Sequence, residues 1–197
     1  MTHSRTAAVV VAALIVLAAA PAARAADGGG PLKLLIGGGF TSGGDNLVGT
    51  ALADGSTPEM KAGRGLQAYA GGEYWITEPL AVQMTIGFQF DRRKVSGGNL
   101  MFQRFPLEVM GLYAITNNLR LGAGAQVVFG ARLRGSGDAA SLSQSYKHST
   151  GRVIEGEFLI TPHTAVKLRH VSEKFTAGDG APKIKGDHVG VMFSYYF

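Results

Sequence analysis

The chain has 197 residues, a hydrophobic fraction of 46% and a formal net charge of +5 at pH 7, and it contains no cysteine. The lack of cysteine excludes a disulfide framework, and the modest charge carries no signature of nucleic-acid binding. After residue 20 no apolar run is long enough for a membrane-spanning helix, whereas apolar and polar residues alternate along most of the chain, which excludes disorder.

The first 25 residues have the organisation of a cleaved signal peptide. Arg5 supplies a positive charge, residues 7–20 form a short apolar region, and Ala23-Arg24-Ala25 matches the small-residue pattern of a cleavage site. The apolar run is too short and too rich in alanine for a membrane anchor. We therefore expect export from the cytoplasm and one mature domain, residues 26–197.

Eight segments of alternating apolar and polar residues follow, each bounded by turn residues. They predict eight strands, in chain order Leu32–Phe40, Gly65–Ile76, Leu80–Asp91, Met101–Ile115, Leu119–Arg132, Thr150–Ile160, Thr164–Phe175 and Asp187–Phe197.

The connections between these segments alternate in length. Three are tight turns (77–79, 116–118 and 161–163) and four are long loops (41–64, 92–100, 133–149 and 176–186). An even number of strands with both ends on the short-turn side is typical of transmembrane barrels. The sequence thus predicts an all-β fold: an eight-stranded antiparallel up-and-down transmembrane β-barrel with short periplasmic turns and long extracellular loops. A soluble, lipocalin-like barrel is the alternative.

Residue parity assigns the two faces of each strand. In the third strand, for example, Leu80, Val82 and Met84 face outward, and Gln83 and Thr85 face inward. Tyrosines near the turns and phenylalanines near the loops would form two aromatic girdles, namely Tyr74, Tyr113 and Tyr195, and Phe40, Phe88, Phe90, Phe105 and Phe129.

The same parity places charged residues inside the barrel. A charge facing lipid at mid-membrane costs about 2–4 kcal/mol, so these side chains belong in the lumen. Pairing about Pro162 sets Glu157 opposite Lys167 and Glu155 opposite Arg169. We interpret the set as a balanced ion-pair network that fills the lower lumen; a selectivity ring or proton path is the alternative. Its members are Lys33, Glu73, Glu108, Arg120, Glu155, Glu157, Lys167 and Arg169.

The last strand and several internal segments resemble the small outer-membrane β-barrel proteins of Gram-negative bacteria, of the OmpA/OmpX/OmpW-like kind. The resemblance rests on Phe105–Met110, Leu119–Gly124 and the final Ser194–Phe197. It implies an outer-membrane location, and it implies that the barrel-assembly machinery reads the alternating end of the chain, Phe193, Tyr195 and Phe197. Because such barrels have diverse functions, it implies fold and location better than activity.

Basic residues gather in the predicted outer loops. Lipopolysaccharide presents phosphates on that side of the membrane, and Arg and Lys bind phosphate electrostatically. A solvated loop face is the alternative. The candidate contacts are Arg92, Arg93, Lys94, Arg132, Arg134, Lys147, Lys183 and Lys185. The segment Thr50–Ala62, around Asp54-Gly55, reads as a hairpin that extends the first two strands.

Catalytic and metal motifs are weak. His170-Val171-Ser172 is similar to the His-x-Ser of barrel lipid A deacylases, but Glu173 stands where that family has Asn, and Ile184 lies about where its acid is expected. Glu173 and His188 are expected to face each other across the last two strands as an ion pair. The histidines lack metal-ligand spacing, and Gly37-Gly38-Gly39 opens no helix, so it is not a phosphate loop.

The sequence therefore predicts a monomeric, non-enzymatic barrel without metal or cofactor. Its expected role is structural or interactive, with outer-membrane lipid and lipopolysaccharide as partners. A narrow channel for small or hydrophobic solutes is the first alternative, and a lipid A-modifying enzyme is the second.

Overall fold

The computed structural model describes residues 31–49, 55, 57–178 and 181–197. The predicted signal peptide lies outside the described residues, as does the centre of the expected hairpin at Asp54. Within the described ranges, no helix has the length and apolar composition needed to cross a membrane.

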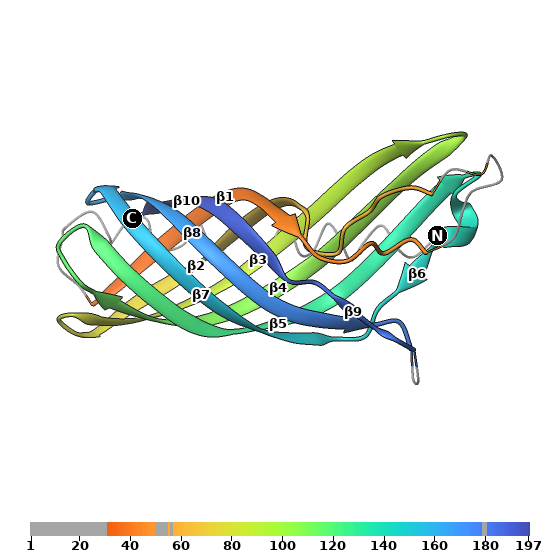
Figure 1. The fold of residues 1–197 in the computed structure, drawn as a ribbon. Coiled ribbons are helices and arrows are strands. Elements are labelled where there is room, and N and C mark those ends of the chain that lie inside the picture. The colour runs from red at the N-terminus through yellow and green to blue at the C-terminus, as the bar shows by residue number, and fades with distance from the viewer. Residues whose placement is uncertain (1–30, 50–54, 56, 179–180) are drawn as a thin grey trace, which may run out of the picture.

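Eight long antiparallel strands form a closed ring, and two short strands and a 3₁₀ turn lie beyond it at one end (Figure 1). The ring order is β10-β1-β2-β3-β4-β5-β7-β8, and β8 pairs with β10 to close it. The elements are β1 (Leu32–Gly43), β2 (Gly65–Thr77), β3 (Leu80–Val95), β4 (Gly98–Ala114), β5 (Leu119–Gly137), η1 (Ala140–Leu142), β6 (Gln144–Ser145), β7 (Ser149–Thr161), β8 (Thr164–Thr176), β9 (Lys183–Lys185) and β10 (His188–Tyr196). The predicted eight-stranded up-and-down barrel is confirmed.

The ring closes where β10 lies against β1 along its whole length, from Leu35 opposite Tyr196 to Gly43 opposite His188. A side chain at Gly37 would collide with the Tyr69 ring and with the β10 backbone. Glycine at this position therefore lets Tyr69 of β2 pass over β1 on the inner wall and hydrogen-bond the Ser194 hydroxyl of β10 at 2.7 Å.

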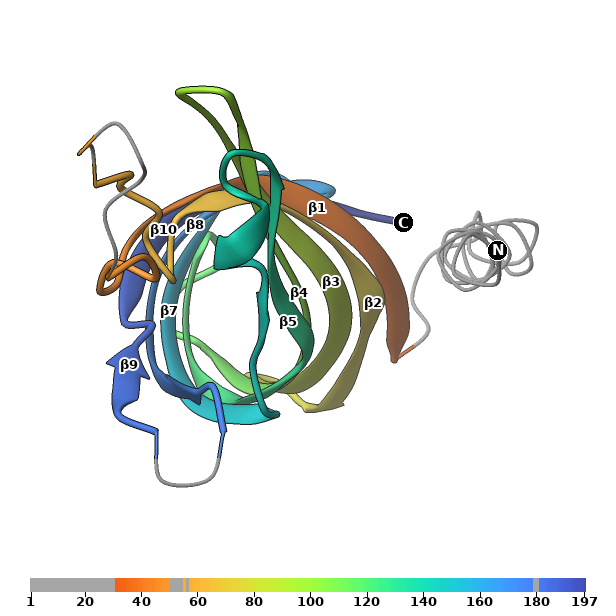
Figure 2. The same ribbon diagram turned by 90° about the vertical axis from the view of Figure 1, so that its right-hand side faces the viewer.

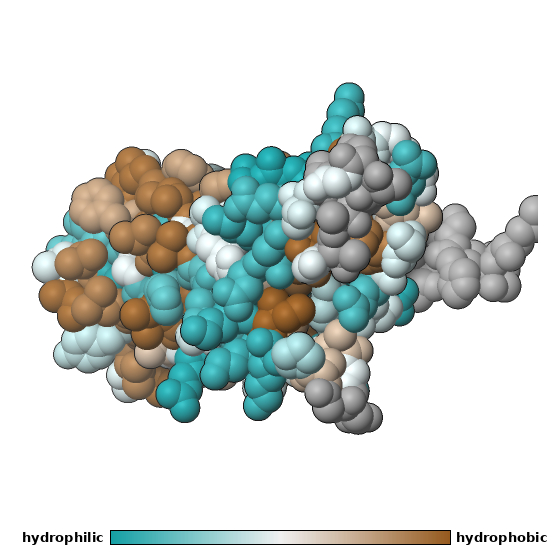
Figure 3. All heavy atoms as spheres, turned by 45° about the vertical axis from the view of Figure 1, so that its right-hand side comes forward, coloured by the Kyte–Doolittle hydropathy of each residue, from teal (hydrophilic) through white to brown (hydrophobic). Residues whose placement is uncertain are grey.

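Burial alternates along every ring strand, and the exposed positions carry large apolar side chains. Leu121 and Phe193 are more than half exposed, as are many of their neighbours. Figure 3 shows these side chains gathered on the half of the barrel near the turns, with hydrophilic residues toward the loops. Tyr74, Tyr113 and Tyr195 lie exposed near the turns, and Phe40, Phe90 and Phe129 lie exposed near the loops. We call this surface the apolar belt.

The short turns set the register as predicted. Glu157 lies opposite Lys167 and Glu155 opposite Arg169 across β7 and β8. All four side chains therefore point into the barrel, and each is buried.

The loop end differs from the expected alternation of long and short connections. The region 92–100, predicted as a long loop, is the end of β3, a two-residue turn and the start of β4, with Val95 opposite Gly98. Gly97 supplies the positive φ of +68° that such a tight turn requires. The polar residues of this hairpin lie above the belt, where a strand has no need of apolar side chains. Figure 1 shows the β3–β4 hairpin standing out at the loop end.

A bulge in β5 changes its parity. Val128 and Ala131 are both buried, with Phe129 exposed between them and Gly130 at φ +60°. The extra residue turns Arg132 outward, although the parity of the lower half of β5 would have placed it in the lumen.

An apolar cluster, here called the loop plug, lies at the loop end. Its members come from the first loop, the upper strands and the segment after β5, and include Leu47, Val48, Met60, Ala62, Leu100, Phe102, Val128, Ala131, Leu133, Ala139, Tyr146 and Phe175. Figure 2, viewed from the loop end, shows the segment after β5 and the first loop at the rim of the ring. Phe102 packs edge-on against Tyr146 and Phe175.

Candidate functional site

The lower lumen, toward the turns, is organised around Arg120 of β5. Its guanidinium bonds Glu157 of β7 through Nε at 2.7 Å and Glu73 of β2 through Nη1 at 2.8 Å. It also donates to the Tyr196 hydroxyl at 2.8 Å, and that hydroxyl donates to the second oxygen of Glu157. Arg120 thus joins three strands that are far apart in the sequence, and all of these side chains are buried.

Two further cations continue this network toward the loops. Lys167 of β8 bonds Glu155 at 3.0 Å and the side-chain oxygen of Gln83 at 3.0 Å. Arg169, also on β8, bonds Glu108 of β4 at 2.6 Å. The lumen of an eight-stranded barrel is only wide enough to be filled by side chains. These contacts join side chains from facing strands and fill the lumen at this level.

Lys33 does not join the network that the sequence predicts for it. It lies opposite Glu73 in the register of β1 and β2, but it makes no ion pair within the described part of the chain. Glu73 instead accepts one hydrogen bond from Arg120 and one from Gln83, each on a different oxygen. The lower network therefore has three cations and four carboxylates, with the Gln83 amide and the Tyr196 hydroxyl as neutral donors, and it is not charge-balanced.

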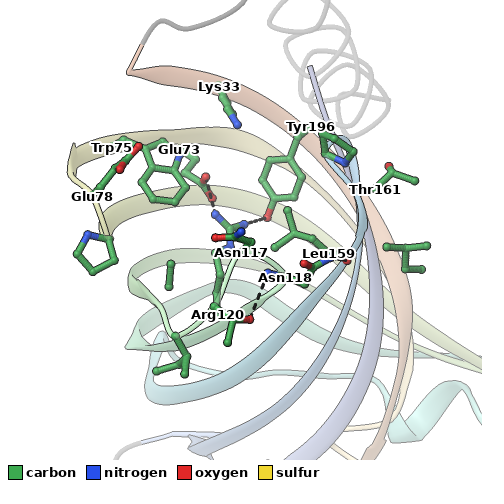
Figure 4. Close-up of a pocket in the computed structure, with 16 residues that line it drawn as sticks. Lys33, Glu73, Trp75, Glu78, Asn117, Asn118, Arg120, Leu159, Thr161 and Tyr196 are labelled. Carbon is green, nitrogen blue, oxygen red and sulfur yellow. Dashed lines mark hydrogen bonds and ion pairs between the residues drawn. The ribbon is translucent and has the colours of Figure 1, made fainter.

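A hollow of about 650 Å³ opens below the network at the turn end. Figure 4 shows Lys33 and Trp75 at its rim, with Arg120 and Tyr196 at its inner end. Arg120 lies over the rings of Trp75 and Tyr196, at 5.7 and 5.2 Å from their centroids. The hollow is therefore closed toward the loops by the charged network itself.

A second polar layer, centred on Arg104 of β4, lies above the first. Arg104 forms a close ion pair with Glu173 and donates from Nε to Gln89 at 3.0 Å. Gln126 donates to the other Glu173 oxygen at 2.9 Å, and the His188 ring lies 3.5 Å from Glu173, so these two residues face each other. Our sequence reasoning missed Arg104, although the parity that places Glu108 inward also places Arg104 inward.

The loop plug continues the filling above this second layer. The Arg104 guanidinium lies 5.5 Å from the centroid of the Phe175 ring, which belongs to the plug. Burial raises the pKa of the Tyr146 phenol to about 12, because the ionised form would be poorly solvated there. From turns to loops, the lumen therefore contains an open hollow, two charged layers and an apolar plug.

The outer basic residues divide by strand face. Arg92, Lys94, Arg132 and Arg134 are exposed on the outer face of β3 and β5, directly above the belt. Arg92 and Arg134 flank the same β4 residue, Met101, in one cross-strand row. We call these four residues the basic face.

Arg93, predicted to be one of the outer contacts, does not lie on the outer face. It lies on the inner side of the extended β3, 3.6 Å from Asp91, because alternation continues through the hairpin. Lys183 and Lys185 lie exposed on β9, across the barrel from the basic face, and Lys147 lies exposed beside β6.

The deacylase-like residues do not form a catalytic triad. His170 and Ser172 both point to the outer face of β8, and the Ser172 hydroxyl donates to Asp187 at 3.1 Å. A triad needs the histidine between the serine and the acid, whereas His170 makes no hydrogen bond to either within the described residues. Nor does any group of three potential metal ligands come together among these residues.

No family model matches the sequence, and no curated protein is similar to it in sequence. Solved structures share its fold. One is Ail, the attachment invasion locus protein of Yersinia pestis, in complex with the heparin analogue sucrose octasulfate; it has a TM-score of 0.53 and 12% identity, over 84% of this chain and 97% of Ail. Another is Neisserial surface protein A (NspA), with a TM-score of 0.52 and 10% identity, over 87% of this chain and 100% of NspA. The chain therefore has the fold of the small outer-membrane β-barrels.

Proposed function

We propose that this protein is a Gram-negative outer-membrane barrel with a structural and surface-interaction role, whose basic face binds the phosphate groups of lipopolysaccharide. The observation that carries the proposal is the position of this face. Its four cations stand directly above the apolar belt, at the level where lipid head groups meet the outer surface of such a barrel.

The apolar belt supports the membrane location. Soluble monomers rarely expose contiguous apolar patches larger than a few hundred Å², whereas here large apolar side chains are exposed on every strand of the ring. Phe193, Tyr195 and Phe197 lie on the outer side of β10 or just after it. This is an accessible position for the assembly machinery, and we propose them as its recognition residues.

The positive charge of the basic face supports lipopolysaccharide as its ligand. Among the outward residues of β3, β4 and β5 above the belt, the charged ones are Arg92, Lys94, Arg132 and Arg134, and none is acidic. Each Lys or Arg near an anionic membrane surface contributes about 1 kcal/mol. Ail, which has the same fold, was crystallised with sucrose octasulfate, another polyanionic saccharide.

Replacing Arg92, Arg132 and Arg134 together by glutamine is expected to weaken lipopolysaccharide binding about 100-fold at low salt, because three cations are lost. Binding of the folded protein to immobilised lipopolysaccharide, repeated at rising salt, measures this. Arg92→Gln alone should weaken binding, whereas the matched control Arg93→Gln should not, because Arg93 faces inward beside Asp91. Equal effects of the two single variants would refute the basic face as the binding surface.

The filled lumen favours this role over the channel alternative. In planar bilayers the refolded protein, checked by its heat-dependent gel mobility, is expected to give no discrete conductance steps. The reason is that ions would have to pass both a desolvated charged layer around Arg104 and the apolar plug. An open porin in the same bilayer serves as the positive control. Reproducible steps from this protein would instead support a channel.

A further inference from the structure

The barrel wall has a gap between β7 and β8 at the loop end. Pairing of the two strands ends at Gly151 opposite Glu173. Beyond this pair, β7 continues against β5 as far as Ser149, and β8 turns to pair with β9, beginning with Lys174 opposite Lys185. The gap is bridged above by one backbone hydrogen bond, from Lys147 N–H to the Thr176 carbonyl at 2.9 Å.

A polar hollow of about 530 Å³ occupies this gap. Three cations line it: Arg152 of β7, Lys174 of β8 and Lys183 of β9. Each is exposed, and none makes an ion pair within the described ranges. Their positive charge is thus available to a ligand, unlike that of the lumen cations.

Hydrogen-bonding groups complete the lining. His148, Thr150 and Thr176 contribute polar side chains around the cations. Ser149 is also among the lining residues, but its hydroxyl is buried on the inward face of β7 and does not open into the hollow.

Two acidic groups lie nearby, and neither forms an ion pair with the three cations among the described residues. Glu173 lines the hollow from the lumen side, but its carboxylate is held by Arg104 and Gln126. Asp187 accepts hydrogen bonds from the Ser172 hydroxyl and from the Glu173 N–H. The three cations with the surrounding hydroxyls form a pattern complementary to a compact anion of high charge.

We propose that this hollow is a binding site for a phosphate group, held by Arg152, Lys174 and Lys183. A phosphate monoester carries a charge of about −1.5 to −2 at pH 7 and three strong acceptor oxygens, which match three cations and a set of hydroxyl donors. The site lies between β7 and β8, one strand away from Arg132 and Arg134 of β5, and it shares no residue with the basic face. The phosphate is either a free ion or part of a lipid head group, since Arg152 is exposed on the same outer face of β7 as Ile154 of the apolar belt, two residues away.

The test titrates the folded protein in a zwitterionic detergent by calorimetry, first with inorganic phosphate and then with micelles that contain phosphatidic acid. Wild type is expected to bind at least one of the two. Arg152→Gln and Lys174→Gln should each weaken that binding about tenfold, the loss expected for one charge-assisted hydrogen bond. Lys61→Gln is the matched control, because Lys61 lies in the first loop and pairs with Glu59, and it should leave binding unchanged.

The two probes distinguish a site for a free phosphate ion from a site for a lipid head group. Binding of phosphatidic acid much more tightly than inorganic phosphate identifies a head-group site, and equal affinities identify a site for the free ion. Because Arg152 and Lys174 are exposed, their variants are expected to fold, which gel mobility checks. The proposal is overturned if neither probe binds, or if Arg152→Gln and Lys174→Gln bind as tightly as Lys61→Gln. Neither result would bear on lipopolysaccharide binding by the basic face, which is tested by Arg92→Gln.

Discussion

Replacing Arg120 by methionine is expected to lower the free energy of unfolding by about 3–5 kcal/mol, the usual cost of removing one partner from a buried ion pair. Methionine fills much of the same volume, but it leaves Glu73 and Glu157 buried without their cation. The large effect reflects these two stranded carboxylates and not the net contribution of the ion pairs, which can be close to zero.

Denaturant unfolding followed by the fluorescence of Trp75, the only tryptophan of the chain, measures this change. Arg134→Met is the matched control, because Arg134 is exposed, and its effect should stay within about 0.5 kcal/mol. Adding Glu157→Gln to Arg120→Met should recover part of the loss by removing one stranded charge. If Arg120→Met were as stable as Arg134→Met, the ion pairs of Arg120 would not be as strongly buried as the structure shows.

Replacing Phe102 by alanine is expected to cost about 3–5 kcal/mol, because it opens a cavity in the middle of the loop plug. Phe102 is 1% exposed and contacts both Tyr146 and Phe175, so neither neighbour can easily close the space. The first loop should also loosen, since Leu47 and Met60 lose a packing partner.

The same denaturation experiment measures the stability change, and the rate of tryptic cleavage in the first loop measures the loosening. Phe102→Leu is the control, because it keeps most of the apolar volume and should cost less than about 1.5 kcal/mol. Similar stabilities for Phe102→Ala and Phe102→Leu would mean that the plug tolerates a void and packs loosely.

The sequence was most informative where a strand meets the belt. A period of two, such as Leu80, Val82 and Met84, is visible locally, and it predicts the strand and both of its faces at once. The turn at Pro162 likewise carries its own register, so the pairing of Glu157 with Lys167 needed no other information.

The loop end was harder for a physical reason. Above the belt a strand can carry polar residues on both faces, so the end of β3 around Arg92 has the composition of a loop. The Gly130 bulge reverses parity midway along β5, and no local pattern announces it. The plug gathers residues from distant segments, such as Met60 and Phe102, into one cluster, which periodicity does not encode.

In the candidate sites too, the sequence predicted what a single strand determines and missed what depends on contacts between strands. Parity placed the carboxylates and cations of the lower lumen, because each sits on a regular strand. It could not show that Glu73 pairs with Arg120 and that Lys33 makes no ion pair among the described residues, since that depends on how far each side chain reaches. The hollow between β7 and β8 arises from a change of pairing partner at Gly151, which is a property of the sheet and not of either strand alone.

The closure of the ring by β10 has a mechanical consequence. In an open sheet an edge strand can peel away by breaking one ladder of hydrogen bonds, but here β10 is held by β1 on one side and β8 on the other. The ladder with β1 joins segments from opposite ends of the domain. A pulling force on the C-terminal end of the barrel domain therefore loads both ladders of β10 together, and β10 should not detach by breaking one ladder alone.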